Sequence, residues 1–168
     1  GVGVVPEPDG SWVRDALTLE RLEYCILVDQ NGKKRYERGP KVVFPEPTEV
    51  FVTRDGARKF KAIELNAIQG LHVKVIAPYA EGGRTYKEGD ELFITGAETA
   101  IYYPREEHAL VGDKHFAVAV PAGEGRYVMN RTTGHIRMVR GPAMLLPNPI
   151  DEVIVRRMWR EGGEHVRS

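Results

Sequence analysis

The chain has 168 residues, and 42% of them are hydrophobic, which is enough for a folded core and too much for a disordered tail. Its 24 basic residues balance its 24 acidic residues, so we do not expect a dedicated nucleic-acid binder or a binder of anionic membranes, which depend on positive charge. The single cysteine, Cys25, excludes an internal disulfide framework and predicts a reducing compartment, the cytoplasm. No run approaches the roughly 18 apolar residues that a membrane span requires.

The N-terminal part of the chain predicts one short helix followed by a hairpin. Residues 11–19 are the best helical candidate, with Ser11 as a possible N-cap. The apolar run 24–28 that follows predicts a strand. It ends in Asp29-Gln30-Asn31-Gly32, where the Asn-Gly pair favours the positive φ values of a tight hairpin turn.

The rest of the chain predicts short strands, because glycine and proline interrupt it at short intervals. In residues 71–75, Leu71, Val73 and Val75 alternate with polar residues, which is the period of a half-buried strand. Residues 127–129 and 136–139 flank a polar connection that ends in Gly134, and this arrangement predicts a second hairpin.

Three stretches of the chain share one pattern, which predicts a series of similar structural units. In the first and third, a turn glycine is followed seven residues later by Gly-Pro, and then by Pro-x-Pro and Glu-Val. The second stretch is looser, because its corresponding glycine, Gly96, is followed by Ala97 instead of proline. We call Gly39, Gly96 and Gly141 the marker glycines. The residues expected to make turns are Asn31, Gly32, Gly83 and Gly134, and those expected to mark strand ends are Gly39, Pro40, Gly96, Gly141 and Pro142.

The backbone properties of glycine and proline explain why strands would end at the Gly-Pro pairs. We expect Gly39 and Gly141 to adopt φ values closed to other residues, while the proline that follows each fixes φ and lacks an N–H donor. One unit of three or four short strands is too small to cover its own core. Neighbouring units must therefore cover it, either along the chain or from another subunit.

At these positions the sequence resembles the major vault protein repeat family, the repeats of the shell protein of the vault particle. The resemblance is carried by Arg38-Gly39-Pro40, by Arg140-Gly141-Pro142, and by the segment 70–75 that leads to 83–92, and it covers roughly residues 22–157. It implies antiparallel β repeats stacked along an elongated chain, with identical chains packed side by side into a closed wall. It does not imply an enzyme.

The predicted fold class is therefore all-β, with tandem small antiparallel β-sheet modules and little helix. The predicted parts are an N-terminal extension (1–21), three β repeat modules (22–60, 61–112 and 113–157) and a charged C-terminal tail (158–168).

We expect no catalytic residue, no cofactor and no metal. His108 and His115 are seven residues apart, which does not place two ligands on one helical face. Glu106 and Glu107, if they lie on a strand, point to opposite faces and do not share a site. Cys25, within an apolar strand, is expected to be a buried small hydrophobe rather than a nucleophile.

Two features of the charge distribution have more than one interpretation. Arg156, Arg157 and Arg160, with Trp159 among them, form a basic-aromatic cluster that suits nucleic acid but is expected instead to pack on a neighbouring subunit. Residues 61–110 carry a net charge of −3 and residues 111–168 carry +3. These two parts could attract each other head to tail, although scattered surface charge explains the values equally well.

The sequence thus predicts a structural subunit that packs laterally against copies of itself, or against other assembly subunits, in a shell, ring or tube. The alternative is a structural or adaptor protein in the virion of a bacterial virus, which binds other proteins by strand addition. A third possibility, a hydrolytic or sugar-active β enzyme, has no supporting constellation of residues.

Overall fold

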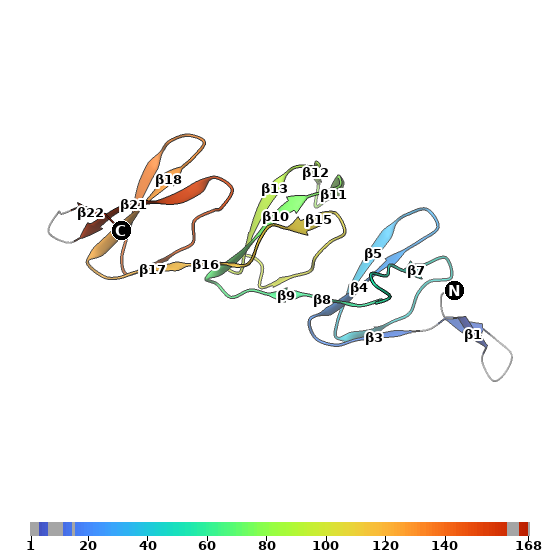
Figure 1. Cartoon of the computed structure of the whole chain (residues 1–168). Coiled ribbons are helices and arrows are strands. Elements are labelled where there is room, and N and C mark those ends of the chain that lie inside the picture. The colour runs from blue at the N-terminus through green and yellow to red at the C-terminus, as the bar shows by residue number, and fades with distance from the viewer. Residues whose placement is uncertain (1–3, 7–11, 15, 161–164, 168) are drawn as a thin grey trace. The chain divides into compact units, whose positions relative to one another are not determined.

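The structure, a computed structural model, describes residues 4–6, 12–14, 16–160 and 165–167. Within these residues every regular element is a short β-strand, and the strands lie in several small antiparallel sheets (Figure 1). This confirms the predicted all-β fold class. The chain divides into two compact units, Gly1–Ile63 and Glu64–Ser168. In the described part of the chain, no helix is long and apolar enough to cross a membrane.

In the first unit, β4 is the centre of a sheet of order β5-β4-β7, and β8 also pairs with β4. Strands β3 and β6 form a separate two-stranded sheet, and we call β3 to β8 the first strand set. Leu19, Cys25 and Leu27 are at most 1% exposed in the core between them. The strands are β1 (Val4–Pro6), β2 (Trp12–Arg14), β3 (Leu17–Leu19), β4 (Glu23–Val28), β5 (Lys34–Arg38), β6 (Lys41–Val43), β7 (Val50–Phe51) and β8 (Phe60–Lys61).

The helix predicted over residues 11–19 is wrong. Of its described residues, 12–14 lie in β2, 17–19 lie in β3 and Ala16 stands just before β3, while Ser11 and Asp15 fall outside the described residues. In β3, Leu17 and Leu19 are buried and Thr18 between them is exposed, which is the period of a strand. Pairing with β6 therefore decides the conformation of a segment whose local helical preference is weak.

In the second strand set, β10 is the central strand of the order β13-β10-β15, and β16 also pairs with β10. Leu71, Val73 and Val75 are buried along β10, as the alternation predicted. The hairpin β11–β12 forms a two-stranded sheet of its own. The strands are β9 (Ile63–Glu64), which pairs with β14, β10 (Gln69–Val75), β11 (Tyr79–Glu81), β12 (Arg84–Tyr86), β13 (Glu91–Thr95), β14 (Ile101–Tyr102), β15 (His108–Leu110) and β16 (His115–Phe116).

In the third strand set, β18 is central in the order β19-β18-β21-β22, and β17 pairs with β20. Val120, Val128 and Leu145 form its buried cluster. The hairpin predicted around residues 130–134 is present between β18 and β19. The strands are β17 (Val118–Val120), β18 (Glu124–Asn130), β19 (Ile136–Arg140), β20 (Ala143–Leu145), β21 (Glu152–Arg160) and β22 (His165–Arg167).

The three strand sets share one plan. Each has a long central strand with a hairpin partner on one side and a later strand on the other, and each has a separate two-stranded sheet. The register matches as well, because Leu27, Val73 and Val128 are buried at corresponding positions of the three central strands. The division into three modules at the boundaries given above stays a prediction, which this recurrence supports.

The hairpin turns show where glycine is needed for its backbone. Gly32 has a φ of 82° in the β4–β5 turn, and Gly134 has a φ of 76° in the β18–β19 turn. In the first of these turns, the Asp29 carboxylate also accepts hydrogen bonds from the backbone N–H groups of Asn31 and Lys33, at 2.8 and 2.9 Å. This side chain fixes the turn in the way typical of aspartate before Asn-Gly.

The expectation of unusual φ values at Gly39 and Gly141 is wrong, because neither residue has a positive φ. The structure shows another requirement for glycine there. A Cβ atom on Gly39, Gly96 or Gly141 would overlap the backbone carbonyl oxygen of Glu20, Asn66 or Pro121, respectively. Each marker glycine also donates its N–H to the first residue of the central strand in its set, at 2.8 to 2.9 Å. Close contact between two backbone segments therefore excludes a side chain at all three positions.

Candidate functional site

The strand sets leave many large apolar side chains in contact with solvent. Phe44 after β6 and Phe116 in β16 are the most exposed, at 66% and 60%. Ile136 and Met144 of the third set are each more than half exposed. The other exposed large apolar residues are Val42, Val50, Ile68, Ile76, Leu110, Val111, Val118 and Val153. Single exposed apolar residues are ordinary, but these small sheets leave a large number of apolar side chains in contact with solvent.

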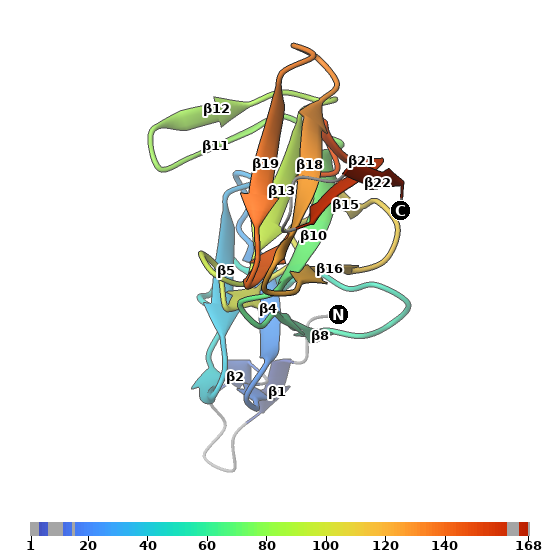
Figure 2. The ribbon, with the colours of Figure 1, turned by 90° about the vertical axis from the view of Figure 1, so that its left-hand side faces the viewer.

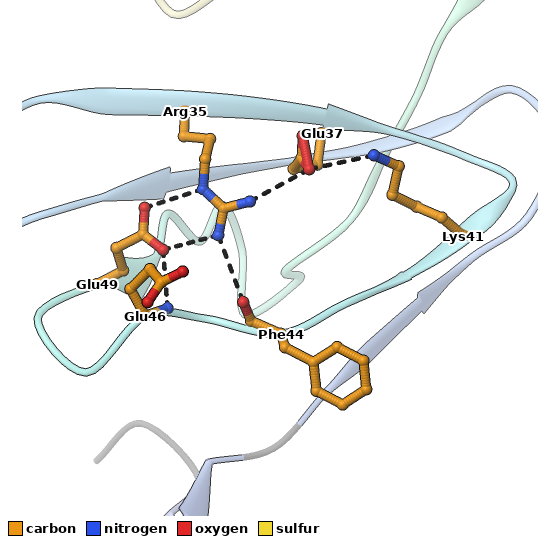
Figure 3. Close-up of polar contacts among 6 residues, drawn as sticks. All are labelled: Arg35, Glu37, Lys41, Phe44, Glu46 and Glu49. Atoms are coloured by element: carbon orange, nitrogen blue, oxygen red, sulfur yellow. Dashed lines mark hydrogen bonds and ion pairs between the residues drawn. The ribbon is translucent and has the colours of Figure 1, made fainter.

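A polar cluster lies between β5 and the Pro-x-Pro loop of the first set (Figure 3). The Arg35 guanidinium donates to both carboxylate oxygens of Glu49, at 3.0 and 2.7 Å, and also approaches Glu37 at 3.2 Å. Glu49 is 7% exposed and accepts a further hydrogen bond from the backbone N–H of Glu46. The hydrogen bonds with Glu49 raise the pKa of Arg35 above its ordinary value. This carboxylate therefore ties the loop to the hairpin, while the Phe44 ring points away from the cluster.

The same arrangement occurs in the third set. Arg137 donates to the Glu152 carboxylate at 3.3 Å, and Glu152 accepts from the backbone N–H of Asn148 at 2.9 Å. Small pockets lie at both clusters, with volumes of about 290 Å³ in the first set and 220 Å³ in the third. The ion pair thus forms part of the wall of each pocket.

Strand register identifies the equivalent residues of the second set. The buried central residues Leu27, Val73 and Val128 each face one residue of the hairpin partner and one of the later strand. Leu27 faces Arg35 and Phe51, Val73 faces Leu92 and Leu110, and Val128 faces Arg137 and Ile154. Two residues before Phe51, Leu110 and Ile154 stand Glu49, His108 and Glu152. The second set therefore has Leu92 and His108 where the other two sets have an arginine and a glutamate.

His108 is held by two tyrosines in place of an ion pair. Its Nε2 atom is 2.6 Å from the Tyr79 hydroxyl, and its Nδ1 atom is 2.7 Å from the Tyr102 hydroxyl. Burial, with a further contribution from the positive charge of Arg105, lowers the pKa of His108. Arg105 also stacks over the Tyr79 ring at 4.1 Å and forms an ion pair with Glu81. A neutral imidazole therefore joins β15 to the β11–β12 hairpin.

Where the second set has Leu92 and His108, it also has a groove of about 610 Å³, which is larger and more apolar than the pockets of the other two sets. We call it the aromatic groove. Tyr79 and Tyr86 of the hairpin stack on each other with ring centres 4.7 Å apart and form one wall. The other lining residues are Glu81, Gly82, Arg84, Leu92, Phe93, Ile94, Glu98, Thr99, Tyr102 and His108.

The residues considered from sequence for chemistry do not converge. His108 lies in the aromatic groove, whereas His115 packs edge-on against Phe93. Glu106 and Glu107 lie in the turn before β15 and not on a strand, and Glu107 is buried and forms an ion pair with Arg105 at 3.4 Å. Among the residues described, no group of three or more His, Cys, Asp or Glu side chains is placed to hold a metal ion.

Cys25 is fully buried, and burial raises the pKa of its thiol to about 11. A thiol in this state is a poor nucleophile. Of the basic-aromatic cluster, Trp159 lies under the guanidinium of Arg140 at 4.4 Å, and Arg160 approaches Glu124 at 3.8 Å. The side chains of Arg156 and Arg157 lie outside the described residues.

Sequence reasoning missed the Arg35–Glu49 and Arg137–Glu152 pairs. The signal was present in the repeat itself, because a glutamate follows the Pro-x-Pro segment in both stretches and an arginine stands in the preceding hairpin strand. Which arginine meets which glutamate depends on the strand register, and the sequence pattern does not give that register.

No protein-family model matches the chain. Similar curated proteins include the major vault protein of Mus musculus, 28% identical over 165 residues (89% of this chain and 18% of the relative), and that of Homo sapiens, 28% identical over 161 residues (89% and 17%). The major vault protein of Leishmania braziliensis is 29% identical over 144 residues, covering 80% of this chain and 16% of the relative. The chain thus spans less than a fifth of the length of these relatives. Over most of its own length it is similar to major vault protein, in agreement with the vault-like repeats indicated by the sequence.

Proposed function

We propose that the chain is a non-enzymatic structural subunit whose strand sets pack laterally against copies of itself in a shell, ring or tube. The observation that carries this proposal is the threefold recurrence of one small strand set, each with a small buried core and large exposed apolar side chains. Burying a side chain such as Phe44 against a neighbour contributes about 1.5–3 kcal/mol. Several such contacts along one chain add up to a stable association.

The similarity to major vault protein supports the same function, because the resemblance implies identical chains packed side by side. The cytoplasm is part of this proposal, since a single buried thiol suits a reducing compartment. No cofactor is needed by a subunit of this kind.

Light scattering coupled to size-exclusion chromatography tests the proposal. We expect the purified chain to show a mass several times that of one chain, rising with protein concentration. A mass equal to one chain at every concentration would contradict self-assembly and would favour the adaptor alternative.

A further inference from the structure

The second strand set contains an insertion that the other two sets lack. In the first and third sets the hairpin turn spans only residues 29–33 and 130–135. In the second set, residues 76–88 lie between Val75 and Gly89, which remain hydrogen bonded at 2.8 Å. Figure 2 shows the resulting β11–β12 hairpin extending away from β10 and β13. Connecting segments of this kind lie at the surface, where binding residues are most often found.

The inserted hairpin is held against the rest of the second set by contacts of Tyr79. An isolated two-stranded hairpin is marginally stable in water. Here Tyr79 gains a hydrogen bond to His108 and a stacking contact with Arg105. Tyr79 and Tyr86 face the groove, while Ala80 and Thr85 on the opposite side of the hairpin are exposed. The inserted residues therefore build one wall of the aromatic groove.

The groove suits an aliphatic side chain from another protein segment. With Leu92 and His108 in place of the arginine and glutamate, no ion pair occupies the position that it has in the other two sets. The apolar residues that line the groove include Leu92 and Ile94, which lie on the same face of β13, and Glu98 is exposed at the groove. The surrounding segment, residues 79–98, contains five acidic and two basic residues, and of the two acidic residues that line the groove Glu81 is paired with Arg105. A basic segment that carries an exposed aliphatic side chain fits this surface.

The third strand set offers a segment with these properties. Ile136, at the start of β19, is 53% exposed. Residues 131–140 contain three arginines and no acidic residue, and of the three Arg137 is paired with Glu152. Arg131 donates to the uncharged backbone carbonyl oxygens of Pro149 and Ile150, so these contacts leave its charge uncompensated. Strand β19 is also at the end of its sheet order, so one of its edges pairs with no strand among the described residues.

We propose that the β18–β19 hairpin of one chain docks in the aromatic groove of a second copy, with Ile136 in the groove and Arg131 beside Glu98. The inference rests on the proposed function, self-assembly, and names one interface of it. The two surfaces differ, so the contact is heterologous, and each added chain offers a free groove and a free hairpin for the next. The contact joins the second set of one chain to the third set of another.

Two variants, each lacking one surface, test the proposal. Glu98→Arg reverses the charge at the groove, and Ile136→Glu removes the aliphatic side chain and adds a repelling charge. We expect each variant alone to lose at least tenfold in association by light scattering. Mixed in equal amounts, they should form pairs of twice the mass of one chain, because each supplies the surface that the other lacks. Matched controls, Glu64→Arg and Thr53→Glu, make the same charge changes at exposed residues that neither line the groove nor belong to the β18–β19 hairpin, and they should associate like the unaltered chain.

The outcomes separate this inference from the proposed function. If the unaltered chain associates and both variants associate equally well, or if the mixed variants form no pairs, the inference is overturned while self-assembly stands. If the unaltered chain is a monomer at all concentrations, the proposed function itself is overturned. Both changes are at exposed positions, and circular dichroism with thermal unfolding checks that each variant is folded.

Discussion

At the scale of single residues, the marker glycines carry the most specific structural requirement. In Gly141→Ala, the new Cβ atom would overlap the carbonyl oxygen of Pro121, and no side-chain rotation relieves a clash with backbone. We expect a loss of about 3 kcal/mol in the free energy of unfolding, measured by urea denaturation. The control is Gly134→Ala, which has open space but a positive φ, and it should cost about 1–2 kcal/mol. Equal losses in the two variants would show that the close approach is not what requires glycine.

The ion pairs under the Pro-x-Pro loops give a second prediction at this scale. Glu49→Gln keeps nearly the same shape but removes the charge that accepts from Arg35 and from the loop backbone. We expect a loss of about 1.5–3 kcal/mol in the free energy of unfolding. Glu37→Gln should cost less than about 1 kcal/mol, because both of its cationic partners, Arg35 and Lys41, are at least a third exposed. Chemical denaturation of the two variants side by side decides this, and a larger loss at residue 37 would be the contrary result.

At the scale of strands and hairpins, the sequence predicted what local chemistry determines. The hairpin at 29–33 follows from an Asn-Gly turn after an apolar run, the hairpin at 130–135 follows from a turn glycine between two largely apolar segments, and the alternation in 71–75 predicted the buried face of β10. The predictions failed where the conformation of a segment is decided by pairing with a strand far away in the sequence. Residues 17–19 are a strand because β6 pairs with them.

The candidate surfaces were less accessible to sequence reasoning than the strands. Tyr79 and Tyr102 reach His108 only after the chain has folded, so their spacing in the sequence gave no signal. The aromatic groove likewise depends on strand register, which aligns His108 with Glu49 and Glu152.

The contact between β15 and the inserted hairpin should be sensitive to acid. Because the pKa of His108 is lowered in the folded chain, its contribution to stability is complete above the unfolded value of about 6.5. That contribution is lost as the pH falls through the lower folded value. The groups that face His108 are Tyr79, Tyr102, Arg105, Glu81 and Glu107.

We therefore expect the unaltered chain to lose more stability than His108→Gln between pH 7.5 and pH 5, because glutamine does not titrate. Thermal unfolding of both proteins across this range measures the difference. Parallel pH profiles would contradict the role assigned to the imidazole.

The inserted hairpin should be dispensable for folding. Replacing residues 76–88 with the short turn of the first set should leave β10 paired with β13, since the first and third sets close the same hairpin without an insertion. The circular dichroism spectrum should keep its β character. Loss of cooperative unfolding in this variant would show instead that the insertion is part of the core of the second set.

At the scale of the whole molecule, the proposed assembly rests on the small buried cores and the exposed apolar side chains of the strand sets. Reverse turns, marker glycines and loop-fixing ion pairs give each strand set a defined shape. The groove and the β18–β19 hairpin are the two distinct surfaces that we propose for contact between chains.

Electron micrographs of the purified chain test the central claim most directly, because a regular wall of subunits is visible without any functional assay. We predict closed or tubular particles with a repeating lateral spacing, at concentrations where light scattering detects association. A field of separate, single-chain particles at those concentrations would contradict the account.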